Sequence, residues 1–101
     1  MDRNETIKAI RKALRERSGK SWSVRGGRGS VYGWIYIDTP PSRAVDGHIS
    51  QAERAELAAL LGLDSVDSQG VSVPSSSAYY QEYVDRAAGR QPSRYGTPYW
   101  D

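Results

Sequence analysis

The sequence contains no cysteine, no phenylalanine, one methionine and one histidine among 101 residues. The lack of cysteine excludes a disulfide scaffold, a thiolate zinc site and a cysteine nucleophile. The single histidine leaves no imidazole pair for a metal ion. No apolar run approaches the ~18 residues of a membrane span, and the N-terminus lacks the apolar segment of a signal peptide. We therefore expect a cytoplasmic protein with no membrane partner.

The side chains that catalysis or metal binding would need are scattered along the chain. His48 follows Asp46 and Gly47 in a predicted loop, and no nucleophile or orienting carboxylate is spaced to act with it. The serines fall in predicted caps and turns, where their hydroxyls bond to the backbone. We predict no catalytic residue, no metal site and no cofactor, so the protein is not expected to be an enzyme.

The composition, with 38% hydrophobic and 26% charged residues, suits one small domain with one small core. Helical spacing and period-two alternation, separated by glycine and proline, predict an α+β domain of order α-β-β-α-β-α. The expected helices span 5–17, 51–61 and 77–88, and the expected strands span 20–25, 31–38 and 71–73. Residues 1–89 are expected to form this domain, and residues 90–101 an aromatic tail that docks on it or on a partner.

Local signals predict the helix ends and the core. Asn4 is the expected N-cap of the first helix, Ser50 and Glu53 form the capping-box pattern of the second, and Gly62 ends the second. The first two strands form an antiparallel hairpin in a small sheet packed against the helices. The residues expected to be buried together are Ile10, Leu14, Trp22, Val24, Ile35 and Ile37.

Basic residues are concentrated near the start of the chain. Residues 1–28 hold nine basic and three acidic side chains, a net charge of +6, whereas residues 29–101 hold five basic and nine acidic ones, a net charge of −4. Four of these cations share one helix face at i, i+3, i+4 and i+7, and two more flank the hairpin turn. The candidate residues for binding nucleic acid or an acidic protein surface are Lys8, Arg11, Lys12, Arg15, Arg25 and Arg28. The plain alternative is a solvated helix face.

Aromatic side chains alternate along the second strand of the hairpin. Tyr32, Trp34 and Tyr36 are expected on one face of the sheet, opposite Ile35 and Ile37. Aromatic rings beside arginines on an open sheet are typical of single-stranded nucleic-acid binding. The alternative is that the third helix or the tail covers this face and makes it a second small core.

Tyrosine supplies most of the remaining aromatic surface. Tyr79 and Tyr83 in the third helix, and Tyr99 and Trp100 in the tail, are candidate interface residues, because a tyrosine ring buries area while its hydroxyl keeps a hydrogen bond. The alternative is that Tyr79 and Tyr83 simply pack under the tail.

The hairpin region also resembles a known family. The run from Ile10 to Leu14, the strand from Lys20 to Arg25 and the glycine-rich turn at Gly29 resemble a large polyvalent protein-associated domain, over about residues 7–41. That family recurs in very large proteins of phages and conjugative elements and as small stand-alone proteins. The resemblance implies a helix–hairpin core and a mobile-element setting, and it implies no catalytic residues.

Two functions from different classes follow from these features. The first is a non-enzymatic accessory protein of a phage or mobile element that binds nucleic acid through the basic first helix and the Arg/Gly hairpin. The second is a protein-binding inhibitor or adaptor, of the anti-defence or anti-CRISPR kind, that uses tyrosine-rich surfaces. The two functions differ in how the affinity for the partner depends on salt concentration, because phosphate contacts release counterions and therefore weaken steeply as salt rises.

Overall fold

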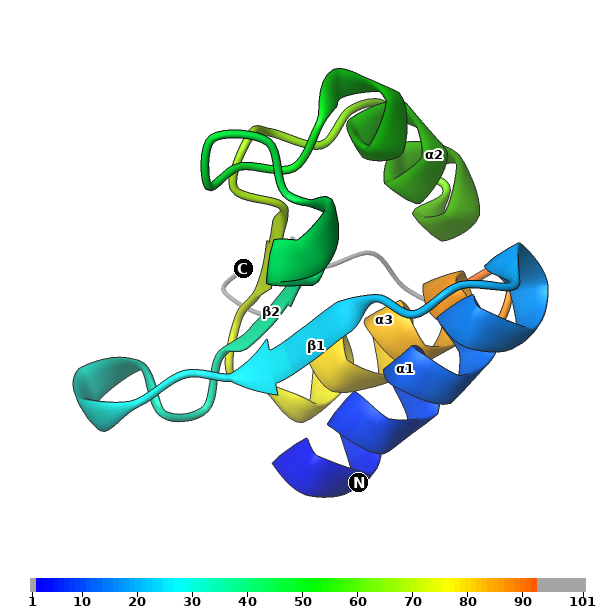
Figure 1. Ribbon diagram of the computed structural model, residues 1–101. Helices are drawn as coiled ribbons and strands as arrows, with labels where there is room; N and C mark the ends of the chain where they lie inside the picture. The colour runs from blue at the N-terminus through cyan, green and yellow to red at the C-terminus, as the bar shows by residue number, and fades with distance from the viewer. Residues whose placement is uncertain (1, 93–101) are drawn as a thin grey trace.

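The computed structural model describes residues 2–92, and over this range it contains three α-helices, three β-strands and two short 3-10 helices (Figure 1). In chain order these elements are α1 (Arg3–Ser18), β1 (Ser23–Gly26), η1 (Gly29–Val31), β2 (Ile35–Asp38), η2 (Pro41–Arg43), α2 (Gln51–Leu61), β3 (Val71–Val73) and α3 (Ser77–Ala87). The predicted α+β class and the order α-β-β-α-β-α are confirmed.

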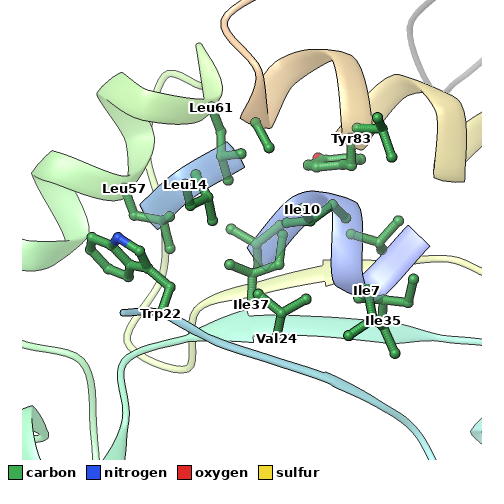
Figure 2. Close-up of a cluster of buried hydrophobic side chains, with 14 of the residues drawn as sticks. Ile7, Ile10, Leu14, Trp22, Val24, Ile35, Ile37, Leu57, Leu61 and Tyr83 are labelled. Atoms are coloured by element: carbon green, nitrogen blue, oxygen red, sulfur yellow. The ribbon is translucent and has the colours of Figure 1, made fainter. Parts of the chain in front are cut away.

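The three strands form one antiparallel sheet of order β1-β2-β3. Ile37 in the central strand lies opposite Val24 on β1 and Val71 on β3, so all three strands contribute apolar side chains to the same face. Figure 2 shows that side chains of α1, the sheet, α2 and α3 meet in one cluster, with Ile10 of α1 near its centre. Helices α1 and α3 therefore cover one face of the sheet, and α2 packs against these two helices.

The predicted core is confirmed. All six of its residues are buried in this cluster, none more than 2% exposed: Ile10, Leu14, Trp22, Val24, Ile35 and Ile37. Their spacing is helical in α1 and period-two in β2, which puts each set on one face of its element. The sequence pattern alone was sufficient to find them.

The first helix begins earlier than predicted. Its N-cap is Asp2 rather than Asn4, and the helix extends from Arg3 to Ser18 instead of 5–17. The Asp2 carboxylate accepts from the Glu5 backbone N–H at 2.8 Å, and the Glu5 carboxylate accepts from the Asp2 N–H at 3.1 Å. This reciprocal capping box stabilises two otherwise unpaired N–H groups, which a cap at Asn4 would not do.

The hairpin strands are shorter than predicted. The first strand covers 23–26 rather than 20–25, and the second begins at Ile35 rather than at residue 31. The Tyr32 N–H donates to the Gly29 carbonyl at 3.1 Å, and the Trp34 N–H donates to the Val31 carbonyl at 3.0 Å. These turn bonds replace ladder bonds, so Tyr32 lies in the loop between the strands, which extends past the end of the sheet in Figure 1.

Glu53 joins α2 to two other segments instead of completing a capping box. The Ser50 hydroxyl accepts from the Glu53 N–H at 3.3 Å, as predicted, but the Glu53 carboxylate accepts from Lys20 at 2.8 Å and from Arg43 at 3.0 Å. Burial raises the pKa of Glu53, and the hydrogen bonds from Lys20 and Arg43 outweigh burial and hold this pKa below its ordinary value of 4.5. The capping-box prediction is therefore half right.

Glu53→Gln is expected to lower the free energy of unfolding by about 1–2 kcal/mol near pH 7, because it removes charged hydrogen bonds. Since the pKa of Glu53 is lower in the folded state than in the unfolded state, its carboxylate stabilises the fold above pH 4.5 and loses that effect as the pH falls through the folded-state pKa. The variant should therefore differ less from the wild type at about pH 3 than at pH 7 in urea unfolding. Glu56→Gln is the matched control. Glu56 also pairs with Lys20 but is 36% exposed, so an equal effect there would contradict the prediction.

Candidate nucleic-acid interface

The predicted basic stripe lies on the outer face of α1. Lys8, Arg11, Lys12 and Arg15 are all exposed, while Ile10 and its apolar neighbours on the same helix are buried. The capping box at the start of α1 fixes where the helix begins, and the buried apolar stripe fixes its rotation against the sheet. Together they orient the four cations toward solvent, and of the four, Lys8 and Arg11 also lie next to β1.

A groove of about 380 Å³ runs between α1 and β1. Its lining residues are Arg3, Asn4, Ile7, Lys8, Arg11, Val24, Arg25 and Gly26. Four of these eight residues are cationic and none carries a carboxylate. Such a groove presents a field of one sign to an anion.

Two arginines are fixed in place along this groove. Arg11 Nη2 donates to the Val24 carbonyl at 2.7 Å, and Arg3 Nη1 donates to the carbonyls of Gly27 and Tyr32 at 3.0 and 2.8 Å. The Arg3 guanidinium also lies 3.9 Å from the centre of the Tyr32 ring. A Cβ atom at Gly26 would clash with the Arg3 guanidinium, so the bare glycine backbone makes room for this group.

Three cations of the predicted set have no hydrogen-bond or ion-pair partner within residues 2–92. These residues are Lys8, Lys12 and Arg28, and all three are exposed. In contrast, Arg15 donates to the Ser21 hydroxyl at 2.7 Å, and Arg25 lies 4.0 Å from the Asp38 carboxylate. The unpartnered cations can take an anion without breaking an existing contact.

The structure does not bring the three predicted hairpin aromatics onto one sheet face. Tyr32 is 62% exposed in the loop after η1, and Trp34 lies before the strand begins. Tyr36 is in β2, where it lies opposite Arg25, whose guanidinium is 5.3 Å from the ring centre. The strict alternation predicted over 31–38 is thus wrong for its first half, and Tyr36 is the member of the set placed on the sheet.

The tyrosines of α3 belong to the core. Tyr79 and Tyr83 are each 9% exposed, so they add little exposed aromatic surface. Burial raises the pKa of Tyr83, and the neighbouring Glu82 carboxylate raises it further. Tyr99 and Trp100, the other two interface candidates, lie outside the described residues.

Several arginines that the sequence did not single out bond to backbone carbonyls instead of lying free. Arg17 Nη1 donates to the carbonyls of Leu60 and Ala87 at 2.7 and 2.8 Å, and so joins the C-terminal ends of α2 and α3. Arg86 donates to the carbonyls of Leu61 and Gly62 at the same end of α2. These contacts depend on which helix ends meet in space, and no local sequence signal marks them. Arg17 and Arg86 therefore stabilise the fold. The cations that remain candidates for binding a partner are those on the face of α1 and β1.

No protein-family model matches the chain, and neither the curated proteins nor the solved structures include a match. The resemblance of residues 7–41 to the polyvalent protein-associated domain stays a prediction. Within residues 2–92, no three histidine, cysteine or acidic side chains are grouped to hold a metal ion. None of the helices in that range has the length and apolar character needed to cross a bilayer.

Proposed function

We propose that the protein binds nucleic acid without catalysing a reaction, and that phosphates lie along the exposed cations of α1 and the groove between α1 and β1. The observation that supports this proposal most is the groove lining, in which Arg3, Lys8, Arg11 and Arg25 meet with no carboxylate among them. Lys8 on its wall is exposed and unpartnered within residues 2–92, so a phosphate need not displace another group there.

The geometry suits a linear polyanion better than a single anion. From Lys8 to Arg15 the exposed cations extend over about 10 Å of helix, at roughly 1.5 Å per residue. Arg25 continues the positive charge across to β1. A row of cations of this length can contact successive phosphates of one strand, and phosphate contacts supply most of the affinity of sequence-independent binding. A role in a phage or mobile element is also proposed, on the resemblance of residues 7–41.

Lys12→Ala is expected to weaken binding to all nucleic-acid sequences alike and to lower the slope of log K against log salt by about one, because one phosphate contact is lost. Fluorescence anisotropy with a labelled oligonucleotide at several salt concentrations measures the slope. Gln51→Glu is the matched control: it lowers the net charge by the same one unit at an exposed position on α2. An equal loss in both variants would show a general charge effect instead of a local contact.

The proposal fails if the wild-type protein shows no affinity for single- or double-stranded nucleic acid at about 50 mM salt, where such binding is strong. The basic face would then be assigned to an acidic protein partner, as in an inhibitor or adaptor. One observation favours that second candidate: Tyr32 and Val31 are 62% and 39% exposed in the hairpin loop, close in sequence to Arg28, which has no partner within residues 2–92. Exposed aromatic and arginine side chains are enriched where proteins bind proteins.

A further inference from the structure

The sheet face opposite the helices carries a second hollow, distinct from the groove. Across the three strands, Arg25, Tyr36 and Ser72 lie side by side in register. Their neighbours along each strand, including Val24, Ile35 and Ile37, are buried on the helix side, so these three side chains point the other way. The hollow measures about 310 Å³ and is lined by Arg25, Tyr36, Asp38, Gly47, His48, Gln69 and Ser72.

The chemistry of this hollow suits a flat ring with polar edges. Tyr36 offers an aromatic face that is half-buried, and Ser72 beside it has a short side chain that leaves room at the ring. Asp38, Gln69 and Ser72 place hydrogen-bond donors and acceptors around it. Nucleobases have this combination of an apolar face and a polar rim, and they stack on aromatic side chains.

Arg25 connects the hollow with the groove. It lines both, because its strand separates the α1 side of the molecule from the open face of the sheet. Its side chain is 60% exposed and reaches both the Tyr36 ring and the Asp38 carboxylate. A nucleic-acid strand whose phosphates lie in the groove therefore passes Arg25, and the hollow on the other side of Arg25 is large enough for one of its bases.

We infer that the hollow at Tyr36 takes an unpaired base and that the nucleic acid bound by this protein is single-stranded. This inference rests on the proposed function and names its substrate class. In a duplex the base faces are stacked on one another and cannot reach Tyr36, so duplexes keep the phosphate contacts alone. Stacking on one aromatic side chain typically changes affinity by about 5- to 150-fold.

The test compares three labelled ligands of about 12 nucleotides, within the range that small single-strand-binding domains cover. They are a single-stranded oligothymidylate, its duplex with oligodeoxyadenylate, and an abasic strand with the same number of phosphates. The wild-type protein is expected to bind the single strand about 10-fold or more tightly than the abasic strand, and more tightly than the duplex. Duplex binding as tight as single-strand binding would contradict the inference.

Tyr36→Ala is expected to remove this difference while leaving affinity for the abasic strand and the salt slope unchanged, because the phosphate contacts remain. Tyr36→Phe keeps the ring and should keep the difference. Ser72→Gln is a second variant, at an exposed position on β3. Its longer side chain fills the hollow and leaves Tyr36 in place, so this variant should behave like Tyr36→Ala. Thermal unfolding checks that each variant is folded.

The outcomes separate the two proposals. If the wild-type protein binds the abasic strand as tightly as the single strand, and Tyr36→Ala changes neither, the base site is overturned while the phosphate groove stands. If the wild-type protein binds none of the three ligands, the proposed function itself is wrong.

Discussion

A protein carrying Lys8→Glu and Lys12→Glu is expected to lose measurable nucleic-acid binding at about 50 mM salt, a reduction of about 100-fold or more. Two phosphate contacts are removed, and two carboxylates are placed where phosphates would lie. These lysines are the cleanest positions for charge reversal on α1, because both are exposed and neither has a hydrogen-bond or ion-pair partner within residues 2–92. By comparison, Arg11 and Arg15 bond to Val24 and Ser21, so reversing them would also disturb the contact between α1 and the β1 region.

The control introduces the same two carboxylates on α2, as Gln51→Glu with Ala55→Glu, both at exposed positions outside the groove. This control should retain most of the wild-type affinity, with unfolding midpoints of both variants close to that of the wild type. Binding by the α1 variant that equals binding by the α2 variant would show that phosphates do not lie along α1.

Ile35→Ala is expected to lower the free energy of unfolding by about 2–5 kcal/mol. Ile35 is fully buried in the central strand between β1 and β3, and shortening it removes apolar contacts and leaves a cavity in the core cluster. A domain of this size has a total stability of about 5–15 kcal/mol, so the variant loses a large share of it. Urea unfolding followed by tryptophan fluorescence measures the change, since Trp22 is in the same cluster.

Val45→Ala is the matched aliphatic control, because Val45 is 57% exposed in the loop before α2. It should change the free energy of unfolding by no more than about 0.5 kcal/mol. If Ile35→Ala unfolds at nearly the wild-type urea concentration, the cluster around β2 is not what holds the fold together.

The core and the element order were predictable because each depends on a short repeating pattern. Ile10 and Leu14 repeat at helical spacing, and Ile35 and Ile37 alternate with Tyr36 and Asp38, so local periodicity was enough to place all four inside. The same reasoning failed at Tyr32, where alternation continues in sequence but the backbone turns through η1. Period-two spacing alone does not distinguish a strand from a tight turn of similar composition.

The sequence was enough to predict which residues belong to the candidate site, but not which of them are held by contacts within the protein. The face shared by Lys8 and Lys12 follows from helical spacing alone. Which arginines remain available depends on contacts between distant segments, such as Arg17 with the ends of α2 and α3 or Arg3 with the hairpin loop. The hollow at Tyr36 likewise requires β3 beside β2, a pairing that the sequence does not specify.

Two arginines of α1, which lie against the outer edge of β1, also affect the tendency of the protein to aggregate at high concentration. A sheet whose outer strands expose unpaired N–H and C=O groups invites strands of other molecules to pair with it, which leads to aggregation. Here the Val24 carbonyl on the outer edge of β1 already accepts from Arg11, and Arg3 lies against Gly26 on the same strand. At the other edge, β3 has three residues and is followed by Pro74, which has no N–H to donate. An incoming strand would have to displace charged side chains at one edge and would find too short a ladder at the other, so the sheet resists polymerising edge to edge.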